Sequence, residues 1–227
     1  MIGLIDSGEG GIITAREIRR LNETLDLTLL LDRRNAPYGT KSESELTELT
    51  GNNIERLLSL GASRVLIACC TASTVWNNLP EGQKKVSVPI LSPTARRAES
   101  VTKNGRIAVI ATAATVRSGA WSRLLFPLRT TELALGELVT LVESGARDGK
   151  ITDTERKNLE KLLSPLSGSG ADTLILGCTH FPALEREIKE IVKKYGIRYT
   201  VSSAREGARE LIRTLTDTSG HGRTVLI

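Results

Sequence analysis

The run Leu174-Ile175-Leu176-Gly177-Cys178-Thr179-His180 decides the fold, because it is a short apolar stretch that ends in small and polar residues. An earlier stretch, Val65-Leu66-Ile67-Ala68-Cys69-Cys70-Thr71, closely resembles it. Stretches with so few polar residues are typical of strands covered on both faces in a parallel sheet. Ile2–Ser7 is likewise echoed by Ile107–Thr112, where each strand ends in a small polar residue. The chain therefore contains a weak internal repeat of two strand types.

Amphipathic segments alternate with these strands and with the apolar run Leu27–Leu31. Helices are predicted at about 11–21, 42–60, 116–125, 152–163 and 184–195. Alternation of this kind predicts an α/β fold with mainly parallel sheets in two pseudo-symmetric halves and a cleft between them. The proline-punctuated stretch Val88–Pro93 marks the boundary. We predict a first domain at 1–92 plus 199–227, and a second at 93–198.

Composition narrows the class of protein. Of 227 residues, 40% are hydrophobic and 25% are charged, which is globular rather than disordered composition. The net charge is +5 and aromatics are only 3%, so we expect no direct nucleic-acid partner. No apolar run is long enough for a membrane span, the start lacks the basic region of a signal peptide, and the cysteine count is odd. These features predict a cytoplasmic protein with free thiols and no membrane partner.

Cys69 and Cys178 are the first candidates for chemistry, because each ends an equivalent strand. Ligands of open α/β sheets bind beyond the carboxyl ends of the strands, so two facing halves would bring both thiols to one cleft. A buried cysteine can instead act as a small apolar residue. Zinc binding by Cys69, Cys70, Cys178 and His180 is a weaker alternative, since adjacent cysteines are not the usual zinc spacing. We expect no metal and no cofactor.

Several polar residues stand close to these thiols in the sequence. His180 lies two residues after Cys178, and an imidazole there can hold a proton or stabilise a thiolate. The loop Asp6–Gly11 follows the first strand, and its leading carboxylate favours a small zwitterionic or carboxylate ligand over a nucleotide; alternatively, Asp6 is simply a helix N-cap. Thr112 and Thr115 can donate hydrogen bonds to a carboxylate.

Taken together, these motifs resemble the glutamate racemases of the cofactor-independent, two-cysteine amino-acid racemase superfamily. The matching residues follow the family's order over nearly the whole chain, and Gly177-Cys178-Thr179-His180-Phe181-Pro182 is the most specific of them. The other matches are Asp6-Ser7-Gly8 with Gly10-Gly11, Pro37-Tyr38-Gly39-Thr40-Lys41-Ser42, Ala68-Cys69, Thr71-Ala72-Ser73, Asn104-Gly105-Arg106, Thr112, Thr115 and Ser118-Gly119-Ala120.

The resemblance implies two flavodoxin-like halves, often dimerised, that interconvert L- and D-glutamate for cell-wall peptidoglycan synthesis and hence cell shape. It implies that Cys69 removes the α-proton of the D-enantiomer and Cys178 that of the L-enantiomer. Asp6 and His180 would assist the thiols, and Glu143 would support the histidine. The implied substrate-binding residues are Ser7, Pro37, Tyr38, Gly39, Cys70, Thr71, Thr112, Thr115 and Thr179.

One departure from the family pattern concerns the substrate. The family usually has asparagine after the first cysteine, whereas this chain has Cys70, which is a weaker hydrogen-bonding group. Ser202-Ser203 also stands where an Asp-Ser pair is more usual. Two alternatives therefore stay open, namely a racemase of aspartate or another amino acid, and a racemase-like binding protein without turnover.

Overall fold

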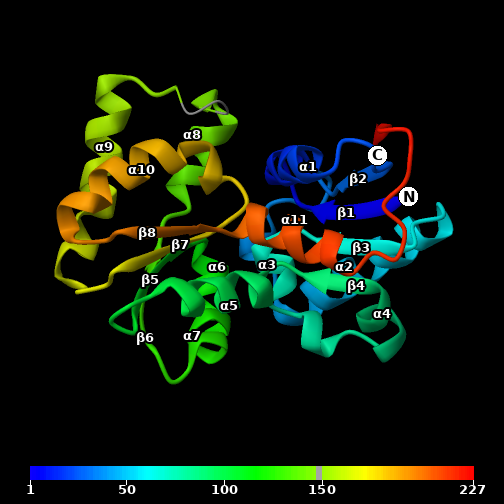
Figure 1. Cartoon of the computed structure of the whole chain (residues 1–227), viewed down its shortest axis with the longest axis horizontal. Coiled ribbons are helices and arrows are strands. Elements are labelled where there is room, and N and C mark those ends of the chain that lie inside the picture. The colour runs from blue at the N-terminus through cyan, green and yellow to red at the C-terminus, as the bar shows by residue number, and fades with distance from the viewer. Residues whose placement is uncertain (147–149) are drawn as a thin grey trace. The chain divides into compact units, whose positions relative to one another are not determined.

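The computed structural model describes residues 1–146 and 150–227, which form two compact units (Figure 1). Unit 1 contains residues 1–93 and 204–227, and unit 2 contains residues 94–203. Each unit has one sheet, and all pairings between the described strands are parallel. The α/β class with parallel sheets and interleaved helices, predicted from the sequence, is confirmed.

Unit 1 has the strand order β4-β3-β1-β2-β9. Its strands are β1 (Ile2–Asp6), β2 (Leu27–Leu31), β3 (Arg64–Ile67), β4 (Ser87–Pro89) and β9 (Thr224–Leu226). Its helices are α1 (Gly10–Leu21), α2 (Glu43–Ser59), α3 (Cys70–Ser73), α4 (Glu81–Val86) and α11 (Ser203–Arg213), with short 3-10 turns at Tyr38–Thr40 and Trp76–Asn78. Helix α5 (Leu91–Val101) begins at the end of this unit and continues into the next.

Unit 2 has the strand order β6-β5-β7-β8. Its strands are β5 (Arg106–Ala111), β6 (Arg129–Ala134), β7 (Thr173–Gly177) and β8 (Tyr199–Ser202). Its helices are α6 (Ala113–Arg117), α7 (Ala120–Leu125), α8 (Glu137–Glu143), α9 (Asp153–Leu163) and α10 (Glu185–Val192), with 3-10 turns at Ser164–Gly168, Phe181–Leu184 and Lys193–Tyr195.

The internal repeat of the sequence appears in the topology of the two sheets. In unit 1 the central β1 lies between β2 and β3, with β4 beyond β3. In unit 2 the central β5 lies between β6 and β7, with β8 beyond β7. Strands β3 and β7, which precede the two cysteines, therefore occupy equivalent positions in their sheets.

Alternating side chains of the unit 1 strands form two apolar cores, one on each face of the sheet. Ile5, Leu30 and Ile67 pack with Leu57 of α2, whereas Leu4, Leu29 and Leu66 pack with residues of α1 and α11. Burial of this kind contributes roughly 1.5–3 kcal/mol for each fully buried large side chain. The core that contains α2 also includes Tyr38 and Cys69.

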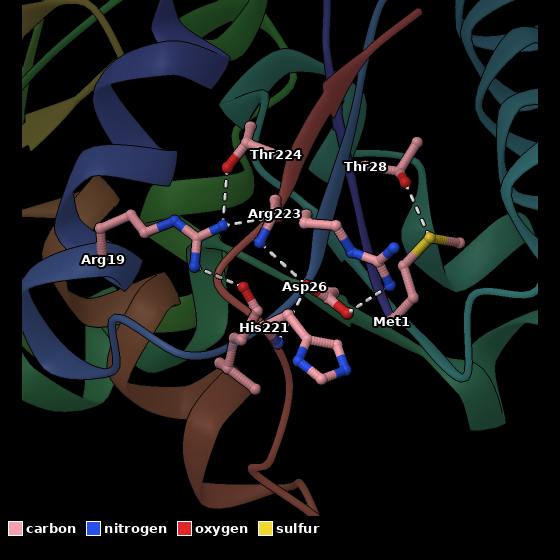
Figure 2. Close-up of polar contacts among 8 residues, drawn as sticks. Met1, Arg19, Asp26, Thr28, His221, Arg223 and Thr224 are labelled. Atoms are coloured by element: carbon pink, nitrogen blue, oxygen red, sulfur yellow. Dashed lines mark hydrogen bonds and ion pairs between the residues drawn. The ribbon is translucent and has the colours of Figure 1, made fainter.

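The edge strand β9 is held on unit 1 by two charged side chains (Figure 2). The guanidinium of Arg19 donates to the carbonyl of Arg223 at 2.7 Å and to Thr224 Oγ1 at 2.6 Å. The carboxylate of Asp26 accepts from the backbone N–H groups of His221 and Arg223, at 3.2 and 2.9 Å. Hydrogen bonds from the Arg223 side chain and backbone lower the pKa of Asp26 to about 2, so this anchor stays ionised at neutral pH.

The observed elements differ from the sequence prediction at three places. The helix predicted over 116–125 is divided into α6 and α7, because Gly119 between them has φ +64°. The segment around Pro93, predicted as extended, is the first turn of α5, where proline is tolerated. Residues 199–203 were assigned to the first domain, whereas Tyr199–Ser202 forms β8, which pairs with β7 in unit 2.

Candidate active site

The carboxyl ends of the neighbouring strands β1 and β3 bring Asp6, Ser7 and Cys69 together in unit 1. Ser7 Oγ lies 3.8 Å from Cys69 Sγ. Asp6 is 1% exposed, and its Oδ1 accepts the Gly8 N–H at 2.8 Å. Helix α1 has Glu9, not Asp6, as its N-cap residue, so the alternative that Asp6 merely caps this helix is wrong.

Gly11 explains why the loop after β1 is rich in glycine. A Cβ at this position would lie 2.8 Å from Asp6 Cβ and 2.6 Å from Leu31 Cδ2. Both distances are shorter than non-bonded carbon atoms allow, since optimal separations are about 3.5–4.0 Å. Only glycine therefore lets α1 start so close to the end of β1.

The thiol of Cys69 is buried, and its pKa is raised to about 11, with burial as the largest cause. The charge of Asp6 is the second cause that raises this pKa, and N–H groups of Ala72 and Thr71 and the hydroxyl of Ser7 partly offset it. At neutral pH this group is therefore held almost entirely as the thiol.

We expect Asp6→Asn to lower the pKa of Cys69, because it removes a negative charge beside the thiolate and leaves burial unchanged. The thiolate fraction at about pH 8 should rise about three- to tenfold. Ultraviolet titration of the thiolate, in a chain whose only cysteine is Cys69 (Cys70→Ser, Cys178→Ser), measures this. Glu48→Gln, on the exposed face of α2, is the charge-matched control. An unchanged or higher midpoint of the thiolate titration in Asp6→Asn contradicts the inference that the Asp6 carboxylate raises the pKa of Cys69.

The other predicted binding residues of unit 1 come from two segments, Pro37–Gly39 and Cys70–Thr71, and differ in exposure. Cys70 and Thr71 form the first turn of α3 and are 2% and 4% exposed. Pro37 is exposed and Gly39 is partly exposed, in the turn that carries Tyr38. Tyr38 itself is buried among the same core residues as Cys69. Its hydroxyl donates to Asp32 Oδ2 at 2.6 Å.

In unit 2, Cys178 follows β7 and begins a chain of three polar side chains. Cys178 Sγ lies 3.7 Å from His180 Nδ1, and His180 Nε2 lies 3.1 Å from Glu143 Oε1. A carboxylate only accepts hydrogen bonds, so the proton of neutral His180 is on Nε2 and its lone pair on Nδ1 faces the thiol. This tautomer, inferred from the contacts, makes His180 an acceptor for the Cys178 proton.

Gly177 fixes the position of Cys178 at the end of β7. A Cβ on Gly177 would lie 2.9 Å from the Ile110 carbonyl oxygen and 3.0 Å from Trp121 Nε1. Glycine is therefore required for β7 to pack against β5 and the fully buried Trp121. The residue before the cysteine is set by this packing rather than by chemistry.

Of the predicted threonines of unit 2, Thr112 and Thr179 lie at strand ends of the same sheet and Thr115 lies in α6. Thr112 follows β5 and caps α6, with its Oγ1 2.9 Å from the Oγ1 of buried Thr115. Thr179 follows Cys178 and is 2% exposed. β5 and β7 are adjacent strands, so these hydroxyl groups and Cys178 belong to one end of one sheet.

Sequence reasoning missed the residues that hold Tyr38. Asp32, Asn35 and Asn53 form a hydrogen-bonded cluster around its hydroxyl. They are spaced irregularly along the chain and form no motif. One sequence feature could have indicated Asp32 as a candidate, because it is a carboxylate directly after the apolar strand Leu27–Leu31.

Within residues 1–146 and 150–227, no group of three or more His, Cys, Asp or Glu side chains is placed to hold a metal ion. Over the same ranges, each helix is too short or too polar to cross a membrane.

Comparison with known proteins supplies the family. The sequence pattern of the Asp/Glu/Hydantoin racemase family matches residues 21–211. The chain is 36% identical to a glutamate racemase of Corynebacterium diphtheriae, over 96% of this chain and 82% of that protein. It is 37% identical to one from Mycobacterium leprae, over 95% and 79%. A glutamate racemase structure from Bacillus anthracis superposes with a TM-score of 0.87 at 30% identity, covering 100% of this chain and 86% of that one. This chain therefore belongs to the Asp/Glu/Hydantoin racemase family, and it is an isomerase.

Proposed function

We propose that this protein interconverts L- and D-glutamate without a cofactor, using Cys69 and Cys178 as its two acid–base groups. The observation that carries the proposal is that each thiol ends an equivalent strand, β3 or β7, beside a side chain able to influence its proton. The named relatives are glutamate racemases, which supports glutamate as substrate. D-Glutamate made in the cytoplasm would supply peptidoglycan synthesis.

The proposed reaction inverts the α-carbon in two proton transfers. One thiolate takes the α-proton, so a C–H bond breaks, an S–H bond forms and the electron pair is left at Cα beside the carboxylate. The second thiol then donates its proton to the opposite face, re-forming a C–H bond and becoming the thiolate. Hydrogen-bond donors placed around the carboxylate stabilise the carbanion, as Ser7, Thr71, Thr115 and Thr179 would do here.

The two protonation states support a direction for the first turnover. Cys69 rests as the thiol because burial raises its pKa, whereas Cys178 can pass its proton toward His180. We propose that Cys69 is the acid of the resting protein and that Cys178, with its proton passed to His180, is the base. This is the state needed to start from L-glutamate, if Cys178 acts on the L-enantiomer and Cys69 on the D-enantiomer.

Optical activity tests this function directly. L-Glutamate and D-glutamate, incubated separately with the protein and no added cofactor, should both approach the racemate. Because the two enantiomers have equal free energy, kcat/KM must be the same in both directions. Bound glutamate that keeps its configuration would overturn the proposal and favour a binding protein.

Aspartate is the second candidate substrate, and Cys70 is the reason to test it. Replacement of the usual asparagine by a buried thiol changes the hydrogen bonds available at the start of α3. If L-aspartate racemises in the same assay and L-glutamate keeps its configuration, aspartate is the substrate and glutamate is not.

We expect Cys70→Asn to improve glutamate turnover. Restoring an amide hydrogen bond of about 1–3 kcal/mol should raise kcat/KM by roughly one to two decades. Steady-state kinetics with both enantiomers measures the gain, and Cys70→Ser is the control that changes the residue without adding an amide. No gain in Cys70→Asn would indicate a pocket fitted to another amino acid.

A further inference from the structure

We infer that Asp32 is a positioning residue for the Cys69 half of the site, acting with Asn53 through Tyr38. The inference rests on the proposed function, in which Cys69 acts on the substrate, and on the substrate contact of Tyr38 and Gly39 that the family resemblance implies. It adds residues that the motifs of the sequence do not contain. The contacts that carry it all lie within unit 1.

Asp32 is fixed at the same end of the sheet as Asp6. It directly follows β2, and its backbone N–H donates to the Asp6 carbonyl oxygen at 2.9 Å. β1 and β2 pair with Leu31 opposite Asp6, so Asp32 continues the line of strand ends. Its backbone position is therefore set by the sheet and not by a mobile loop.

The carboxylate of Asp32 accepts hydrogen bonds from three side chains. Oδ2 accepts from the Tyr38 hydroxyl at 2.6 Å and from Asn53 Nδ2 at 3.2 Å. Asn35 Nδ2 lies 2.9 Å from Oδ1 and 3.1 Å from Oδ2. Burial raises the pKa of Asp32, but the hydrogen bonds from Tyr38, Asn53 and Asn35 outweigh it and leave the pKa below its ordinary value. The group is thus an ionised acceptor at neutral pH.

Tyr38 is held by this cluster in a fixed role. Its hydroxyl proton is donated to Asp32, and its oxygen accepts from Asn53 Nδ2 at 3.1 Å. Burial, and next the hydrogen bond to Asp32, raise the pKa of the phenol far above its usual value, so it does not exchange its proton at neutral pH. Tyr38 therefore acts as a buried packing residue in the core that contains Cys69. It is not an acid beside Cys69 and Cys178.

The Asp32–Tyr38 hydrogen bond should affect substrate binding more than proton transfer. Anchoring the phenol fixes the backbone of the turn that carries Gly39, which we propose contacts the substrate. Loss of the anchor should weaken ground-state and transition-state binding together, which raises KM and changes kcat little. Simple destabilisation behaves differently, because a smaller folded fraction lowers apparent kcat and leaves KM unchanged.

A double-mutant cycle tests the inference. Asp32→Asn and Tyr38→Phe should each raise KM for glutamate about tenfold, the scale of one lost hydrogen bond to a charged group, with kcat within about threefold. The double variant should be no worse than the worse single variant, because Asp32 acts through Tyr38. Effects that multiply, or an unchanged KM, would overturn the inference.

Asp172→Asn is the matched control. Asp172 is a carboxylate of unit 2 with a lowered pKa that accepts from Thr102 Oγ1 at 2.7 Å and from the Lys103 N–H at 2.7 Å. It precedes β7, at the end of the sheet opposite Cys178. Its substitution should lower the melting temperature and leave KM unchanged.

A second measurement does not depend on turnover. In the chain with Cys69 as its only cysteine, we expect Asp32→Asn and Tyr38→Phe to speed alkylation of Cys69 about three- to tenfold. Without its anchor, Tyr38 packs less firmly and the core around Cys69 opens more often. The double variant should match the faster single variant. Absence of glutamate turnover in the unmodified protein, with this pattern intact, refutes the proposed function but not the anchoring. Alkylation rates equal to that of the parent single-cysteine chain refute the anchoring itself.

Discussion

We expect Cys69→Ser and Cys178→Ser each to abolish racemisation of both enantiomers. A serine hydroxyl has nearly the size of a thiol but is a far weaker acid, so it neither holds the α-proton nor returns it. Loss of one acid–base group is worth about 10²–10⁴ in rate, and a mechanism with one group on each face has no substitute for either. Polarimetry with L- and D-glutamate measures the loss.

Cys70→Ser is the internal control for both variants. It alters a buried thiol directly beside Cys69 and should keep most of the activity, because the proposed proton transfers do not pass through it. Full activity in Cys69→Ser or in Cys178→Ser would show that the assignment of the thiols is wrong.

The second large effect concerns the partner of Cys178. We expect His180→Asn to lower kcat by about 10²–10⁴, since the acceptor for the Cys178 proton at 3.7 Å is lost. Glu143→Gln should lower kcat by only about tenfold, because its side chain is 46% exposed and acts through the imidazole. Steady-state kinetics as a function of pH separates these effects.

The chain offers a matched control for the histidine. It has only two histidines, and the other, His221, lies in the C-terminal segment held by Asp26 through its backbone (Figure 2). His221→Asn should retain full activity. A His180→Asn variant with unchanged kcat would mean that the Cys178 proton moves without the imidazole.

The parallel sheets and the ends of their strands could be predicted from sequence because local patterns determine them. Apolar runs such as Leu174–Leu176 form buried strands, and all five predicted strands are present. The Ser42–Glu45 spacing predicts a capping box, which the structure contains at the start of α2. These features depend on residues close together in the chain.

Features that depend on distant contacts could not be predicted in this way. β6 consists of mostly polar residues that are exposed or partly buried at a sheet edge, so it lacks the apolar signal of the other strands. The short apolar run of β8 fits either sheet, and only its pairing with β7 places it in unit 2. The three-residue strand β9 depends on Arg19 and Asp26, about two hundred positions away in the sequence.

The same distinction applies to the candidate site. Asp6, Cys69, Cys178 and His180 were found because each follows a recognisable strand within a short motif. The Tyr38 cluster was missed because Asp32, Asn35 and Asn53 come from a strand end, a loop and a helix. Nothing in their spacing indicates that they meet around the Asp32 carboxylate and the Tyr38 hydroxyl.

The hydrogen isotope that enters glutamate in deuterium oxide tests the central claim most directly. If two thiols act on opposite faces of the α-carbon, early conversion of L-glutamate should yield D-glutamate with deuterium at Cα, while the remaining L-glutamate keeps protium. Proton magnetic resonance of the separated enantiomers measures both. Deuterium entering the remaining L-glutamate as fast as D-glutamate forms, or D-glutamate that retains protium, would contradict the account.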